Sequence, residues 1–112
     1  MLIVTETMFV RIMLNESPVA FSEEALKLIY QHYRQEDADV DFRVADVELA
    51  FDEESYFECV ENNDIPLEGL EKASSEYEKT EFVKRAIAKF LESANALIGF
   101  TTRHTVVYKT NW

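Results

Sequence analysis

Apolar and polar residues alternate at the start of the chain, over residues 3–14. From position 4, every second residue except Glu6 is apolar and would share one face of an extended segment: Val4, Met8, Val10, Ile12 and Leu14. A period of two residues is typical of a β-strand. The pattern therefore predicts a long strand over residues 3–14, followed by a connection at Asn15–Ser22.

The period changes to that of a helix in residues 23–36. Apolar residues recur there at helical spacing: Ala25, Leu26, Ile29, Tyr30 and Tyr33. Ser22 is a good N-cap, and Glu23 and Glu24 follow it where the helix dipole favours negative charge. We predict a helix over residues 23–36.

The apolar residues of 43–65 follow neither the period of a helix nor that of a strand. We predict a short helix or an extended piece through Val44–Phe51, then a helix from Ser55 to about Asn62. This second helix would turn its apolar residues inward: Tyr56, Cys59 and Val60. Pro66 ends the region, because proline cannot continue the hydrogen bonds of a helix interior.

The widest apolar stripe lies in residues 80–94, and two strand-like runs follow it. Thr80 is the predicted N-cap of a long helix whose apolar face repeats at helical spacing: Phe82, Val83, Ala86, Ile87, Phe90, Leu91 and Ala94. The runs Ala96–Thr101 and Thr105–Thr110, joined around Arg103, predict an antiparallel hairpin.

This order of elements predicts a single α+β domain over residues 1–112. We expect a small antiparallel sheet, made of the N-terminal strand and the C-terminal hairpin, with about three helices packed on one face. A chain of this length, 47% hydrophobic, can bury a core without disulfides. Its single cysteine, Cys59, allows no internal disulfide and is expected to be a buried small hydrophobe.

The net charge of −11 is concentrated in the middle of the chain. Residues 36–78 hold sixteen acids and two bases, whereas residues 79–112 are net +4. Direct binding of nucleic acid is not expected, because a phosphate backbone requires a basic face. Clustered like charges destabilise the compact state. The large excess of acids in residues 36–78 therefore suggests that this segment presents carboxylates to a basic protein partner.

The predicted partner-binding residues are ten acids of this segment between Asp37 and Asp64. They are Asp37, Asp39, Asp41, Asp46, Asp52, Glu53, Glu54, Glu58, Glu61 and Asp64. The aromatic end of the chain, Tyr108–Trp112, could in addition pack against a second copy and form a homodimer. No apolar run is long enough to span a bilayer, and the N-terminus lacks the basic start of a secretory signal, so we expect a cytoplasmic protein.

Part of the acidic segment has the spacing of a calcium-binding loop. Asp37, Asp39, Asp41 and Glu48 stand at the first, third, fifth and twelfth positions, as oxygen ligands do in an EF-hand. Phe42 occupies the sixth position, where the sharp turn requires glycine. In a segment this acidic such a spacing also arises by chance, so a solvated acidic segment is the preferred interpretation and a calcium module the alternative.

Signatures of catalysis are missing from the sequence. His32 and His104 are the only histidines, and neither has the paired spacing of a zinc site. The chain has no glycine-rich phosphate loop, no G-x-S-x-G and no H-E-x-x-H. We therefore expect no enzymatic activity, no cofactor and no bound metal.

Three stretches, FSEEALKLIYQHY, ADVELAFDEESYFECVENND and ALIGF with TVVYKTNW, resemble small acidic proteins of bacteriophage genomes. Those proteins pair an early amphipathic helix with an acidic segment and end in a short hairpin. Some small acidic phage proteins inhibit restriction enzymes or CRISPR effectors by imitating nucleic acid. The resemblance implies a phage-encoded, non-enzymatic inhibitor that acts in the host cytoplasm on a basic, nucleic-acid-binding protein. An accessory protein with another role is the remaining alternative.

Overall fold

The computed structural model describes residues 4–36 and 42–110. The helices of these ranges are α1 (Glu6–Glu16), α2 (Glu23–Glu36), α3 (Val44–Ala50), α4 (Tyr56–Asn63), α5 (Glu76–Ser93) and the short 3-10 helix η1 (Leu70–Lys72). The strands are β1 (Phe51–Ser55), β2 (Leu97–Phe100) and β3 (Thr105–Lys109), which form an antiparallel sheet in the order β1-β3-β2. The predicted α+β class is confirmed.

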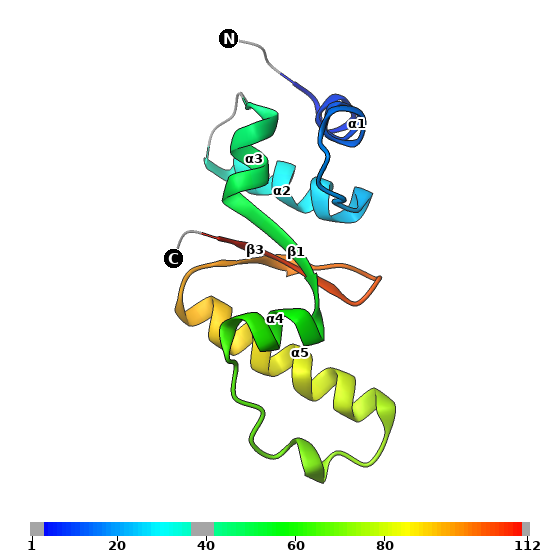
Figure 1. Ribbon diagram of the computed structural model, residues 1–112, viewed down its shortest axis with the longest axis vertical. Coiled ribbons are helices and arrows are strands. Elements are labelled where there is room, and N and C mark those ends of the chain that lie inside the picture. The colour runs from blue at the N-terminus through cyan, green and yellow to red at the C-terminus, as the bar shows by residue number, and fades with distance from the viewer. Residues whose placement is uncertain (1–3, 37–41, 111–112) are drawn as a thin grey trace.

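Helices cover both faces of this sheet (Figure 1). The cluster on the face of α1, α2 and α3 includes Val107 of β3, and the cluster on the face of α4 and α5 includes Val106 and Tyr108 of the same strand. The expectation that the helices pack on one face was therefore wrong. Successive residues of a strand point to opposite faces, and β3 is apolar on both, so each face requires its own cover.

The first segment is a helix, which corrects the prediction of a strand over residues 3–14. The Thr5 side chain accepts a hydrogen bond from the Met8 N–H at 3.2 Å and caps α1. Phe9, Val10 and Met13 are buried at helical spacing, whereas Met8, which a strand would have turned inward, is 42% exposed. The strand that lies beside the hairpin is instead β1, which pairs with β3 from Phe51–Lys109 to Ser55–Thr105.

The prediction of a helix over residues 23–36 is confirmed by α2. The Ser22 hydroxyl accepts a hydrogen bond from the Ala25 N–H at 3.1 Å, as an N-cap does. Of the two predictions for Val44–Phe51, the short helix holds as far as Ala50. The helix expected from Ser55 is α4, which begins at Tyr56 after a capping box of Ser55 and Glu58.

The long helix and the hairpin are also present, with one corrected boundary. Helix α5 is capped by Ser75, not by Thr80, whose hydroxyl instead donates to the Glu76 carbonyl oxygen within the helix. In the hairpin, Gly99 marks an irregularity of the β2–β3 register, and a Cβ placed on it would lie 3.0 Å from Leu28 Cδ1. A side chain at position 99 would therefore press on Leu28, which shows how closely α2 packs on β2.

Candidate functional site

The acids of β1 point alternately to the two faces of the sheet, and Glu53 faces the α2 side. Its carboxylate accepts hydrogen bonds from the Ser22 N–H and the Ser22 hydroxyl, each at 2.7 Å, and from the Thr105 hydroxyl at 2.6 Å. It thereby ties the start of α2 to the hairpin. Glu53 was predicted to bind a partner, and the structure places its carboxylate in contacts within the fold.

Glu54 faces the α4 side, where it also has internal partners. The Tyr108 hydroxyl and the Asn62 amide both donate hydrogen bonds to its carboxylate. Burial raises the pKa of Tyr108, and the bond to Glu54 raises it further. Tyr108 therefore stays protonated and remains a donor to Glu54 at ordinary pH.

Asp52 shares this side of β1 but lacks the donors that Glu54 has. It borders a surface hollow of about 390 Å³ together with Asn62, Asn63, Tyr108 and Thr110. Partial burial raises the pKa of Asp52, and the nearby charges of Glu54 and Glu58 raise it further. Ionised Asp52 is therefore held in an unfavourable, negatively charged setting.

The remaining described acids of the predicted set lie on the surface. Asp46 is exposed on α3, Glu58 and Glu61 on α4, and Asp64 directly after α4. The Glu58 carboxylate accepts a hydrogen bond from the Ser55 backbone N–H at 3.1 Å as part of the capping box, and hydrogen bonding to Ser55 lowers the pKa of Glu58. Asp37, Asp39 and Asp41 lie outside the described residues, as do Asn111 and Trp112 of the predicted homodimer contact.

The basic residues of α5 do not neutralise this acidic surface through ion pairs. Within residues 4–36 and 42–110 the ion pairs are local to one helix: Lys27–Glu23, His32–Glu36 and Lys79–Glu76. None of these pairs joins an acid of residues 46–64 to Lys84, Arg85 or Lys89. Lys84 instead lies 5.1 Å from the centroid of the Phe100 ring.

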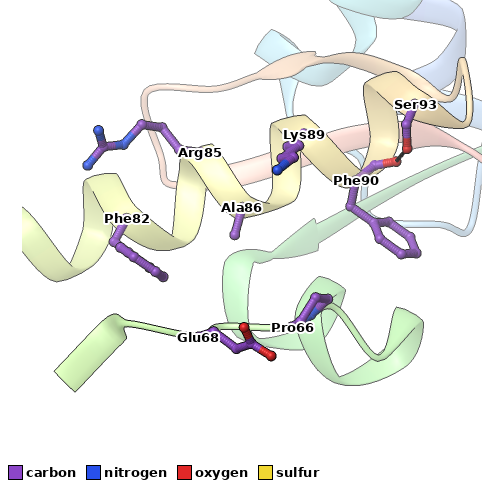
Figure 2. A pocket seen from close by; sticks show the side chains of 8 residues that line it. All are labelled: Pro66, Glu68, Phe82, Arg85, Ala86, Lys89, Phe90 and Ser93. Carbon is purple, nitrogen blue, oxygen red and sulfur yellow. Dashed lines mark hydrogen bonds between the residues drawn. The ribbon is translucent and has the colours of Figure 1, made fainter. Parts of the chain in front are cut away.

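A groove that the sequence did not predict runs along α5 (Figure 2). Phe82, Ala86 and Phe90 point from the helix towards the segment with Pro66 and Glu68, and the groove has a volume of about 670 Å³. Arg85 and Lys89 belong to the same lining and are exposed. The apolar stripe of α5 is wider than the sheet can cover, because Val83, Ile87 and Leu91 alone are fully buried on this helix. In the sequence, the only sign of the groove was the width of the apolar stripe in residues 80–94.

The described part of the candidate calcium loop has other contacts. Phe42 packs against Phe9, with 4.6 Å between the ring centroids, and the Glu48 carboxylate accepts a hydrogen bond from the Ser17 hydroxyl at 2.8 Å. Across the ranges that the structure describes, His, Cys, Asp and Glu side chains form no group of three or more placed to hold a metal ion. Calcium binding at Asp37–Glu48 remains a prediction, because its first three ligands lie outside those ranges.

Cys59 is fully buried, as expected of a small hydrophobe. Burial, with the charge of Glu54 nearby, raises its pKa to about 11, so the thiol stays protonated at neutral pH. The Asn63 amide lies 3.7 Å from its sulfur and donates to the Cys59 carbonyl oxygen at 2.9 Å. The thiol is part of the packing between α4 and the sheet.

Two surfaces are therefore candidates for binding. The exposed acids of α3, of α4 and of the segment after α4 can bind cationic groups, and the groove along α5 can bind an apolar segment with negative charge. No helix within the described residues is both long and apolar enough to cross a membrane. No protein-family model matches this chain, and neither does any curated protein or solved structure with which it was compared.

Proposed function

We propose that this protein is a non-enzymatic interaction protein whose acidic surface binds a basic, nucleic-acid-binding protein and blocks its access to nucleic acid. The observation that carries the proposal is the segment of residues 44–71, which holds ten acids and no base. Six of these acids are exposed: Asp46, Glu58, Glu61, Asp64, Glu68 and Glu71. Helix α3, which carries Asp46, lies on the other side of the sheet from α4 (Figure 1), and Glu58 caps α4. We call the remaining four, Glu61, Asp64, Glu68 and Glu71, the acidic surface. An array of exposed carboxylates attracts a basic protein over long range and speeds its association.

The size of the charge indicates what kind of nucleic acid the protein could replace. The molecule measures 52 by 24 by 21 Å. A DNA duplex 52 Å long carries about 30 phosphate charges, because both strands together contribute one charge per ~1.7 Å. The net charge of −11 is closer to that of a single strand of about ten nucleotides. The partner that fits best is therefore a protein with a short basic groove, of the kind found in nucleases.

Inhibition of a restriction enzyme or a CRISPR effector is the form of this function that the resemblance to phage proteins favours. It remains part of the proposal. An acidic inhibitor of such an effector needs no catalytic residue, because it acts by occupying the site of the nucleic acid.

Affinity chromatography with matched variants tests the proposal. Glu53 and Glu54 are unsuited to such a test because their carboxylates hold hydrogen bonds within the fold. Glu61→Lys with Glu71→Lys alters two exposed acids of the acidic surface, and Glu16→Lys with Glu92→Lys alters two exposed acids elsewhere by the same total charge.

We expect the immobilised wild-type chain and the Glu16/Glu92 variant to retain the same basic proteins from host lysate at low salt. The Glu61/Glu71 variant should lose them, and a DNA oligonucleotide should elute them from the wild-type column. Equal retention by both variants would argue against the acidic surface, and retained proteins that DNA does not displace would argue against competition with nucleic acid.

A further inference from the structure

The groove along α5 differs in character from the acidic surface, although Glu68 belongs to both. Its walls are α5 and the segment that carries Pro66 and Glu68 (Figure 2). A second hollow, lined by Tyr77, Lys72 and others, shares Phe82 and Arg85 with it, so the hollowed surface continues towards the start of α5. Tyr77 is 75% exposed at this end.

The apolar residues of the groove are spaced like the contacts of a docked helix. Phe82, Ala86 and Phe90 are four residues apart on one side of α5, and all three are half-buried. With a rise of 1.5 Å per residue, Phe82 and Phe90 are separated by about 12 Å along the axis. Apolar side chains at positions i and i+7 of a second helix lie about 10.5 Å apart, which matches this separation.

The charge at the rim indicates what the docked segment carries. Arg85 and Lys89 are exposed and one helical turn apart, about 6 Å along α5. They lie in the part of the chain, residues 79–112, that has a net charge of +4. Arg85 and Lys89 complement carboxylates that lie one turn apart on the flank of a docked helix. Glu68 lies on the opposite wall and disfavours carboxylates on the flank that faces this wall.

We propose that this groove binds an acidic amphipathic helix of a partner protein, with its apolar face on Phe82 and Phe90 and its carboxylates on Arg85 and Lys89. A second copy of this chain bound groove to groove is a poorer occupant, because two hollowed surfaces that face each other leave unfilled space between them. The groove thus has the opposite charge preference to the acidic surface.

Two synthetic peptides of about 18 residues, long enough to form a helix, serve as probes. Both carry leucine at positions i, i+3, i+7 and i+10, and their flank residues are either glutamate or glutamine. We measure binding by fluorescence anisotropy at about 0.15 M salt, where charges more than about 8 Å away are largely screened. The glutamate peptide should bind about fivefold more tightly than the glutamine peptide, as expected for two exposed ion pairs.

Two charge-reversal variants locate the site. Arg85→Glu with Lys89→Glu should weaken binding of the glutamate peptide at least tenfold. The control, Arg11→Glu with Arg103→Glu, has the same net charge and alters exposed residues outside the groove, so it should stay within twofold of wild type. Circular dichroism confirms that both variants are folded.

Amide chemical-shift changes should fall on residues 67–68 and 82–93. The proposal is overturned if neither peptide binds or if the two peptides bind equally. It is also overturned if the Arg85/Lys89 variant behaves like its control.

Discussion

Individual acids of one charged run do very different things in this protein. Glu53 and Glu54 accept hydrogen bonds that connect distant elements, Glu58 caps a helix, and Asp52 is held among like charges. The sequence identified the run but could not separate these roles, because each depends on residues far away in the chain, such as Ser22, Thr105 and Tyr108. Of the predicted acids that the structure describes, Asp46, Glu58, Glu61 and Asp64 are exposed.

Removing the charge of Glu53 should destabilise the fold. Glu53→Gln weakens three hydrogen bonds to a charged, half-buried acceptor, and bonds of this kind are worth about 1.5–3 kcal/mol each. We expect the free energy of unfolding in urea to fall by about 2 kcal/mol. Asp46→Asn, at an exposed position, is the control and should change it by less than about 0.5 kcal/mol. A loss no greater than that of the control would show that Glu53 does not tie α2 to the hairpin.

Neutralising Asp52 should have the opposite effect. Its folded-state pKa is raised above 3.8, so protonation favours the folded state, and the associated stability is present below pH 3.8 and lost as the pH rises through the folded pKa. At pH 7 the ionised carboxylate therefore costs stability, and Asp52→Asn should melt at a higher temperature than wild type. This difference should shrink as the pH falls towards 3.8. A variant that melts lower than wild type at pH 7 would contradict the cause given for the raised pKa.

At the scale of elements, the sequence predicted α2, α4, α5 and the hairpin correctly, but it predicted a strand where α1 lies and did not predict β1. Residues 3–14 alternate like a strand, yet the spacing of Phe9 and Met13 and the Thr5 cap suit a helix, and packing on α2 decides between them. Residues Phe51–Ser55 hold three consecutive acids and have no strand-like pattern. They form a strand because β3 supplies backbone partners and because Ser22, Tyr108 and Asn62 donate hydrogen bonds to Glu53 and Glu54. Such long-range partners are invisible to local periodicity.

Two neighbouring residues of α1 distinguish the helix from a strand. Phe9 is fully buried against Tyr30 and Phe42, so Phe9→Ala should lower the free energy of unfolding by about 3–5 kcal/mol. Met8 is 42% exposed, and Met8→Ala should cost less than about 1 kcal/mol. A strand over residues 3–14 would reverse the order, because Met8 would then face the core. Chemical denaturation of the two variants settles which residue is buried.

At the scale of the whole molecule, a sheet covered on both faces separates two small cores, and an excess of acid surrounds them. The sequence predicted the sign and position of the charge, since these follow from composition. It did not predict the groove along α5, since that depends on which half of a wide apolar stripe the sheet leaves uncovered. The sequence therefore predicts where the acids are concentrated, but it does not predict the groove.

The net charge should make the fold more stable as salt increases. Self-repulsion of a chain with charge −11 weakens when it is screened, and the ion pairs between described residues are few and lie on the surface, so their screening costs little. We expect the melting temperature to rise steadily between about 0.01 and 0.2 M potassium chloride, where the Debye length falls from about 30 Å to below 10 Å. A melting temperature that falls over this range would mean that attractive pairs outweigh the repulsion.

The central claim is that the acidic surface takes the place of nucleic acid on a basic partner. The most direct test is a competition with the purified partner, in which a labelled oligonucleotide is displaced by wild-type protein and by the Glu61/Glu71 and Glu16/Glu92 lysine variants. We predict complete displacement by the wild type and the Glu16/Glu92 variant, and at least tenfold weaker displacement by the Glu61/Glu71 variant. A ternary complex of partner, oligonucleotide and wild-type protein would contradict the account, because the protein and the nucleic acid would then bind at different sites.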